Sequence, residues 1–163
     1  MYNKIIKEIL SYRNTEKGIF LSRFFKTGKG EYGEGDKFLG ITVPVSRSIA
    51  KKYKEIELNE IEKLLENKYH EVRLVAILIL VQKYNSLNTK KLSLRSDLGE
   101  KKKIVDFYLK NTKYINNWDL VDLSAHYILG DYLRDKNRGI LIRLSKSKYL
   151  YAVYFPPKNA ISS

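Results

Sequence analysis

Apolar residues recur along this chain at the three-to-four-residue spacing of helices that bury one face. In Tyr2–Tyr12 the apolar positions Ile5, Ile6, Ile9 and Leu10 fall on one side of a helix. No segment shows the strict alternation of a half-buried strand or the turn signature of a hairpin. We therefore expect further helices at Thr15–Lys26, Pro44–Tyr53, Leu58–Asn67, His70–Tyr84, Asp97–Lys110, Asn117–Tyr132 and Arg138–Lys146.

One of these segments is almost continuously apolar. Between Val72 and Val81 nearly every residue is apolar, which predicts a central helix that is buried on most sides. Glycine-rich and polar segments, Thr27–Lys37 and Asn85–Arg95, separate the helices into pairs. At about 40 residues per pair, this all-α pattern suits roughly four HEAT-like repeats stacked in a short solenoid. An ordinary helical bundle is the alternative.

Composition narrows the functional class. The 163 residues include 31 Lys and Arg against 18 Asp and Glu, giving a formal net charge of +13. Such an excess favours a polyanionic partner, nucleic acid before an anionic membrane. The chain has no cysteine and only two histidines, so we expect no metal site and no cofactor bound through thiolates. The N-terminus lacks the apolar core of a signal peptide, and we expect a cytoplasmic protein.

The glycine-rich segment contains a misleading motif. Gly28, Gly30 and Gly33 have the spacing of a dinucleotide-binding loop. That loop requires a strand before it and a helix directly after it. Here a helix is expected before it, and the acidic residues of the segment would repel a pyrophosphate. We interpret the segment as a flexible connection.

The segment Asn117–Tyr132 carries the most informative residues. Asn117 is expected to cap a continuous helix by accepting a backbone N–H with its side-chain oxygen. Trp118 and Asp122 then lie one turn apart on the same face. Asp119 lies in the first turn, where the helix dipole favours a carboxylate, and is expected to be exposed. A tryptophan in a helix is most often a core residue, and an aspartate is most often solvated, but Asp122 lies beyond the best capping positions and needs another explanation.

Three runs of the sequence carry a family resemblance. They are Arg23–Asp36 followed by Phe38–Ile41 and Pro44, then His70–Leu74 continuing through Tyr84, and finally Tyr114–Asp122 with Ser124-Ala125 and Leu129-Gly130-Asp131. In these runs the chain resembles the AlkD-like family of DNA alkylation repair glycosylases. The resemblance implies a single HEAT-like repeat domain over residues 1–147, acting on duplex DNA in the bacterial nucleoid.

The resemblance also implies a chemistry. Family members hydrolyse the N-glycosidic bond of cationic lesions such as 3-methyladenine and 7-methylguanine, without a cofactor or metal and without drawing the base into a tight pocket. A cationic base leaves readily, so one carboxylate suffices to stabilise the sugar cation and orient water, whereas most sugar glycosidases need two.

By the resemblance, Asp122 is the catalytic carboxylate, Trp118 packs against the backbone of the lesion nucleotide, and Phe24 occupies an aromatic position that is tyrosine in some members. Basic side chains are expected to contact the DNA. They are Arg23, Lys26, Lys29, Arg47, Lys101, Lys102 and Lys103.

The resemblance ends near Lys148. The family continues with a tryptophan and a functional arginine, whereas this chain has Tyr151 and Tyr154, followed by two prolines. We expect residues 148–163 to be a divergent tail of a chain truncated relative to the family. The chain is expected to be a monomer. The apolar face that truncation exposes offers a route to self-association.

Two other functions remain open: a non-catalytic HEAT-repeat DNA-binding protein and a HEAT-type protein-interaction scaffold. Only DNA binding predicts a steep salt dependence.

Overall fold

The computed structural model describes residues 1–25, 27–29, 34–89, 94–134, 136, 139–140 and 142. Lys26, the middle of the glycine-rich segment, most of the helix expected at Arg138–Lys146 and the tail at residues 148–163 lie outside the described residues. So does the side chain of Asp97, at the expected start of a helix.

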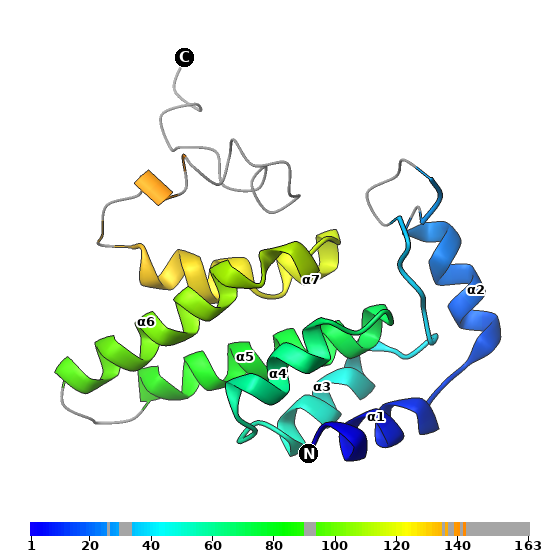
Figure 1. The fold of residues 1–163 in the computed structure, drawn as a ribbon, viewed down its shortest axis with the longest axis horizontal. Helices are drawn as coiled ribbons and strands as arrows, with labels where there is room; N and C mark the ends of the chain where they lie inside the picture. The colour runs from blue at the N-terminus through cyan, green and yellow to red at the C-terminus, as the bar shows by residue number, and fades with distance from the viewer. Residues whose placement is uncertain are drawn as a thin grey trace.

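Helices make up nearly all the regular structure in the described part of the chain (Figure 1). They are α1 (Tyr2–Ser11), α2 (Thr15–Phe24), α3 (Val43–Lys52), α4 (Leu58–Leu65), α5 (His70–Thr89), α6 (Leu94–Lys110), the 3-10 helix η1 (Thr112–Tyr114), α7 (Trp118–Asp122) and the π-helix η2 (His126–Gly130). The described residues contain no β-strand, only an isolated bridge between Lys37 and Tyr69. The all-α prediction is confirmed, and the succession of packed helices is consistent with a helical repeat.

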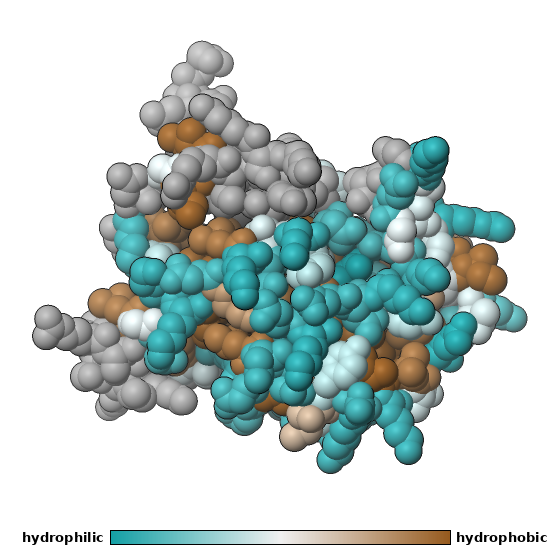
Figure 2. Space-filling view, in the orientation of Figure 1, coloured by the Kyte–Doolittle hydropathy of each residue, from teal (hydrophilic) through white to brown (hydrophobic). Residues whose placement is uncertain are grey.

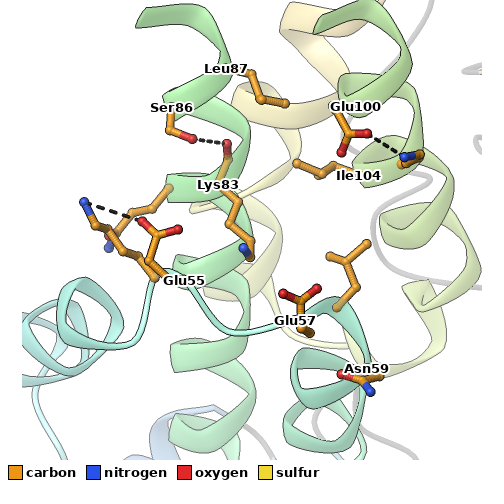
Figure 3. Close-up of a pocket in the computed structure, with 12 residues that line it drawn as sticks. Glu55, Glu57, Asn59, Lys83, Ser86, Leu87, Glu100 and Ile104 are labelled. Atoms are coloured by element: carbon orange, nitrogen blue, oxygen red, sulfur yellow. Dashed lines mark hydrogen bonds and ion pairs between the residues drawn. The ribbon is translucent and has the colours of Figure 1, made fainter. Parts of the chain in front are cut away.

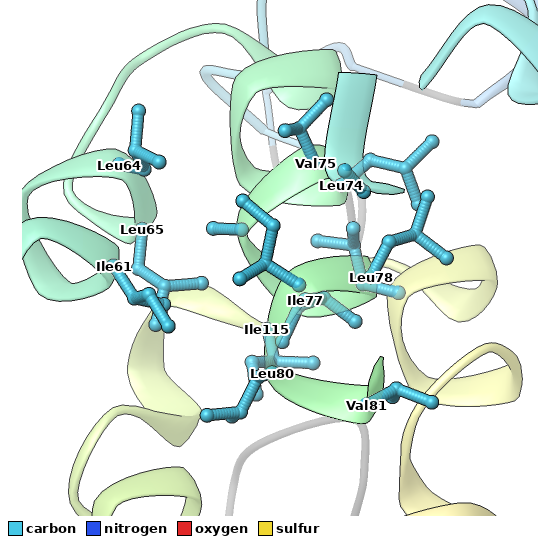
Figure 4. Packing of buried hydrophobic residues seen from close by; sticks show 14 of the residues in the cluster. Ile61, Leu64, Leu65, Leu74, Val75, Ile77, Leu78, Leu80, Val81 and Ile115 are labelled. Atoms are coloured by element: carbon cyan, nitrogen blue, oxygen red, sulfur yellow. The ribbon is translucent and has the colours of Figure 1, made fainter. Parts of the chain in front are cut away.

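The core is organised around α5. Every residue from 71 to 80 is buried, which confirms that the apolar run forms a central helix. Helices α3 and α4 make the most extensive contacts with α5, and α6, η2 and α7 add to them. Figure 4 shows Ile61, Leu64 and Leu65 of α4 packed around the side chains of α5.

The structure corrects two predicted helix boundaries, the end of α5 and the start of α6. Helix α5 continues to Thr89 rather than ending at Tyr84, because the fully buried Tyr84 and the partly buried Leu87 still pack on the core. Helix α6 already begins at Leu94. None of the helices in the described residues is long and apolar enough to cross a bilayer.

Helix α2 stands to one side of the stack and is held there by close backbone contacts (Figure 1). Its N-cap is Asn14, whose side chain accepts from the N–H of Lys17 at 3.0 Å. A Cβ on Gly40, whose φ is +80°, would lie 2.1 Å from the Asn14 carbonyl oxygen. A Cβ on Gly18 would lie 2.8 Å from the carbonyl oxygen of Phe38. Both glycines let α2 approach the segment that leads into α3.

That segment is also held from the core side. One buried carboxylate, Glu71 at the start of α5, accepts the backbone N–H groups of Leu39, Gly40 and Ile41 at 2.8 to 3.2 Å. Three donors on one carboxylate satisfy the buried charge and fix the chain as it enters α3. Pro44 lies in the first turn of α3, as expected.

Candidate functional site

Helix α7 holds the two residues on which the expected chemistry depends. Leu120 and Val121 are fully buried and anchor the helix, while Asp122 is exposed and Trp118 is half-buried. The expected continuous helix over Asn117–Tyr132 is wrong: α7 has five residues, and a turn separates it from η2.

A serine side chain accounts for the break after α7. The Ser124 hydroxyl donates to the Leu120 carbonyl, which the backbone N–H of residue 124 would take in a regular α-helix. That N–H instead bonds to the Val121 carbonyl at 3.1 Å. The Ser124 hydroxyl is also 2.9 Å from the buried Tyr108 hydroxyl, so packing against α6 fixes its position.

Asn117 is the N-cap residue of α7, as predicted, but the predicted capping bond is wrong. Asn117 is fully buried, and its side chain makes no capping bond to α7. Its Nδ2 faces Asp36 at 3.4 Å, and the Nδ2 of Asn116 donates to the other oxygen of Asp36 at 3.0 Å. Asp119, in the first turn, accepts the N–H of Leu120 at 2.8 Å instead.

Asp119 is not the freely exposed carboxylate that the sequence suggested. Its Oδ2 lies 2.6 Å from Nε2 of His70, the first residue of α5, and its side chain is only 24% exposed. On the other side of the ring, Nδ1 of His70 is 3.6 Å from Asp36. Asp36 also forms a 2.7 Å ion pair with Arg73. Two carboxylates and two basic side chains thus form a buried network that joins the start of α5 to α7.

Opposing effects act on the pKa values in this network. Burial lowers the pKa of His70, but the contacts with Asp119 and Asp36 outweigh burial and raise it above 6.5. Burial raises the pKa of Asp36, but His70 and Arg73 outweigh it and hold that pKa well below its usual range. Both shifts favour a protonated His70 beside an ionised Asp36.

Aromatic rings enclose His70. The rings of Phe25 and Phe38 are nearly parallel, with centroids 5.2 Å apart. The ring of Phe38 stacks on His70 at 4.7 Å, and Phe25 lies at 5.5 Å. The stack joins the end of α2 to the network beneath α7.

Two hollows open beside α7. The first, which we call the apolar hollow, has a volume of about 410 Å³ and lies between α2, the entry to α3 and the start of α5, with Asp119 at its edge. Its lining consists of Lys17, Phe20, Leu21, Phe25, Phe38, Gly40, Ile41, Thr42, Val43, His70, Glu71, Leu74 and Asp119. The second, the basic groove, also has a volume of about 410 Å³ and runs between α3, α5 and the turn after α7. Its lining consists of Arg47, Lys51, Lys54, Leu78, Val81, Gln82, Asn85, Leu123 and Tyr127.

Asp122 is exposed on α7, and neighbours of it along the chain line the two hollows. Asp119 lines the apolar hollow and Leu123 lines the basic groove. Residues three and four positions apart share one face of a helix, so Asp122 shares the face of Asp119 and of Trp118. The predicted catalytic carboxylate therefore belongs to a short helix that contributes Asp119 to the apolar hollow and is followed by Leu123 of the basic groove.

The predicted DNA contacts divide into two groups. Lys101, Lys102 and Lys103 pair with Asp131, Asp106 and Glu100, respectively, so local carboxylates offset their charge. Arg47 and Lys51, by contrast, lie one turn apart on α3, and no carboxylate of the described residues forms an ion pair with either.

The remaining predicted contacts, Arg23, Phe24 and Lys29, are exposed at the end of α2 and just after it. Figure 2 shows apolar atoms at this edge of the molecule, beside polar side chains that cover the neighbouring face.

A third hollow lies between the end of α3, α4, α5 and α6. Its acidic side chains make it unfavourable for an anion. It has a volume of about 540 Å³, and Figure 3 shows Glu55, Glu57 and Glu100 around it. The lysines there include Lys54 and Lys103, which pair with Glu55 and Glu100. The mixed charges offer no continuous path for a polyanion.

Sequence reasoning missed the contact between His70 and Asp119, because nothing in one sequence joins residues 49 positions apart. It also missed Lys51, although its spacing of four residues from Arg47 places both on one face of a helix.

Comparison with known proteins adds one finding. A family model described as DNA alkylation repair enzyme matches residues 5–152. Searches of the curated proteins and of the solved structures give no significant match.

Proposed function

The chain belongs to the DNA alkylation repair enzyme family, and from this premise we propose that it is a monofunctional DNA glycosylase that releases cationic alkylated purines, such as 3-methyladenine and 7-methylguanine, from duplex DNA. The observation that carries the proposal is the exposed carboxylate of Asp122 on α7, next to Leu123, which lines the cationic groove, and one turn after Asp119, which lines the apolar hollow.

The chemistry needs little more than a well-placed carboxylate. Alkylation at N3 or N7 makes a purine cationic, so its bond to the sugar breaks without prior protonation of the leaving base. Positive charge then develops on the sugar, and Asp122 stabilises it electrostatically and orients the attacking water. Water adds to the sugar, its proton passes to the carboxylate or to solvent, and the base leaves neutral.

The surroundings of Asp122 support this role. The buried Leu120 and Val121 fix α7 in the core, and the pair between Asp119 and His70 fixes its first turn. Trp118, one turn before Asp122, supplies an aromatic face for the sugar and the cationic base, a contact of about 0.5–2 kcal/mol. Arg47 and Lys51, which lack carboxylate partners in the described part of the chain, offer charge to the phosphates of one strand.

The test is release of free 7-methylguanine and 3-methyladenine from methylated duplex DNA. Asp122→Asn should lower the rate at least about a hundredfold, the scale on which loss of an electrostatic stabiliser acts. Its affinity for the duplex should be unchanged or higher, because a negative charge is removed. The matched control is Asp106→Asn, the same chemical change at an exposed position of α6.

Equal release by Asp122→Asn and the control would exclude the catalytic role of Asp122. If neither variant nor the unaltered chain releases base while salt-sensitive duplex binding persists, the chain is a non-catalytic DNA-binding member of its family.

A further inference from the structure

The apolar hollow is unusual because its aromatic lining stays open to solvent. Phe20 is 67% exposed at its rim, and Phe25 and Phe38 are half-buried in its wall. A concave surface that gathers several large exposed apolar side chains is typical of a binding site. The rings of Phe25 and Phe38 lie parallel and stack on each other within this wall.

The polar groups around the hollow restrict what binds in it. Glu71 is already satisfied by three backbone N–H groups, and His70 is buried. The carboxylate of Asp119 retains exposed surface and is available to accept N–H groups from a ligand. Lys17 stands at the rim with no carboxylate partner in the described residues. A flat ring with N–H groups, attached to a phosphate, matches this arrangement.

We propose that the apolar hollow is a nucleobase site, which receives an unpaired base of the duplex whose strand passes Asp122. The base lies against Phe20, its amino or ring N–H groups face Asp119, and the adjoining phosphate lies near Lys17. This inference rests on the proposed function, since it takes DNA as the partner and α7 as the place where the strand passes.

The hollow is distinct from the reaction centre. Asp119, at its edge, precedes Asp122 by three residues, so both carboxylates lie on one face of α7. A base held in the hollow therefore leaves the next nucleotide of its strand, rather than its own, near Asp122. A second copy of the chain is a poorer occupant, because each copy carries a net charge of +13.

The experiment compares affinities for two duplexes, one fully paired and one with a single unpaired 2-aminopurine, by fluorescence anisotropy at fixed salt. The unaltered chain should bind the second duplex more tightly, and the emission of its 2-aminopurine should change on binding. Phe20→Ala should weaken binding to this duplex about fivefold to a hundredfold, the range for loss of one base–aromatic stack. Its affinity for the fully paired duplex should change less than about twofold, because Phe20 contacts only the unpaired base.

Two further variants make the result specific. Ile19→Ala is the matched control: Ile19 is 54% exposed on the same helix but does not line the hollow, so the preference should persist. Val43→Phe enlarges a side chain that lines the hollow, and should abolish the preference as Phe20→Ala does. Because Val43 and Phe20 are both exposed, neither change disturbs the core.

Equal affinity of the unaltered chain for the two duplexes overturns the proposal, as do equal losses in Phe20→Ala and Ile19→Ala. A dimer that Phe20→Ala dissociates, with no change in base preference, identifies a second copy as the occupant and overturns it too. If the chain excises methylated purines but shows no preference for the duplex with the unpaired base, the glycosylase proposal stands and the nucleobase site is refuted. If it prefers that duplex but excises no base, only the glycosylase proposal is refuted.

Discussion

The basic groove allows a quantitative prediction about DNA binding. Arg47 and Lys51 point charge into the groove beside α7 and lack carboxylate partners in the described part of the chain, whereas Lys102 and Lys103 are each paired. The double change Arg47→Gln/Lys51→Gln removes two charges from the groove. The double change Lys102→Gln/Lys103→Gln removes two charges from α6. Both lower the net charge from +13 to +11.

The expected magnitude follows from counterion release. Each phosphate contact on B-DNA contributes about 0.9 to the slope of log affinity against log salt. Loss of the two groove contacts should therefore reduce the slope by about 1.8. Between 50 and 200 mM salt the affinity of the unaltered chain should consequently fall about tenfold more than that of the groove variant. The α6 variant should keep the slope of the unaltered chain, because exposed pairs already offset those lysines.

The assay is fluorescence anisotropy with one labelled duplex, repeated at four or more salt concentrations. If the two double variants reduce the slope equally, net charge rather than the groove governs binding. A larger reduction in the α6 variant would place the DNA on α6 and refute the assignment of the groove.

The remaining predictions concern stability and are read from urea unfolding. Gly40→Ala should lower the free energy of unfolding by more than the roughly 1–3 kcal/mol of backbone strain alone, because its Cβ would lie 2.1 Å from the Asn14 carbonyl oxygen. Gly35→Ala is the control: Gly35 has φ +83° and no atom within 4 Å of the added Cβ, so this change should cost only the backbone strain. An equal loss of unfolding free energy at Gly40 and Gly35 would contradict the argument. The raised pKa of His70 makes its contribution to stability complete below pH 6.5 and lost as the pH rises through the folded-state pKa. His70→Gln should therefore flatten the decline in stability above pH 6.5, whereas the exposed control His126→Gln should not.

The fold was predictable where the signal is local. The apolar run from Val72 to Val81 identified the central helix, because a helix that is apolar all round has no face left for water. Pro44 marked the start of α3 for an equally local reason, since the first turn needs no N–H at that position. Helix ends that depend on tertiary packing, such as the extension of α5 to Thr89, were not predictable in this way.

The sequence revealed only some of the ion pairs formed by Lys101, Lys102 and Lys103. Lys102 and Asp106 are four residues apart, and Glu100 and Lys103 are three apart, so both pairs follow from helical spacing alone. The sequence alone therefore indicated that carboxylates on the same helix offset the charges of Lys102 and Lys103, two of the lysines expected to bind DNA. The partner of Lys101 is Asp131, 30 residues away, and no local pattern indicates it.

The candidate site depends most on contacts that a single sequence does not reveal. A helix of five residues is not stable by itself, so α7 owes its place to the surrounding fold. Two buried apolar side chains anchor it, but they fix neither its rotation nor its first turn. The pair between Asp119 and His70 supplies that restraint from α5.

The restraint holds only while the charges balance. His70 faces Asp119 on one side and Asp36 on the other, and Arg73 offsets the second carboxylate. Removal of a proton from His70 leaves the buried Asp36 and the partly exposed Asp119 with Arg73 as the one remaining cation of the network, which is unfavourable for the two carboxylates. The cheapest relief is movement of the more exposed carboxylate, Asp119, toward water. We therefore expect the charge state of His70 to influence the position of the first turn of α7, and through it the proposed catalytic role of Asp122.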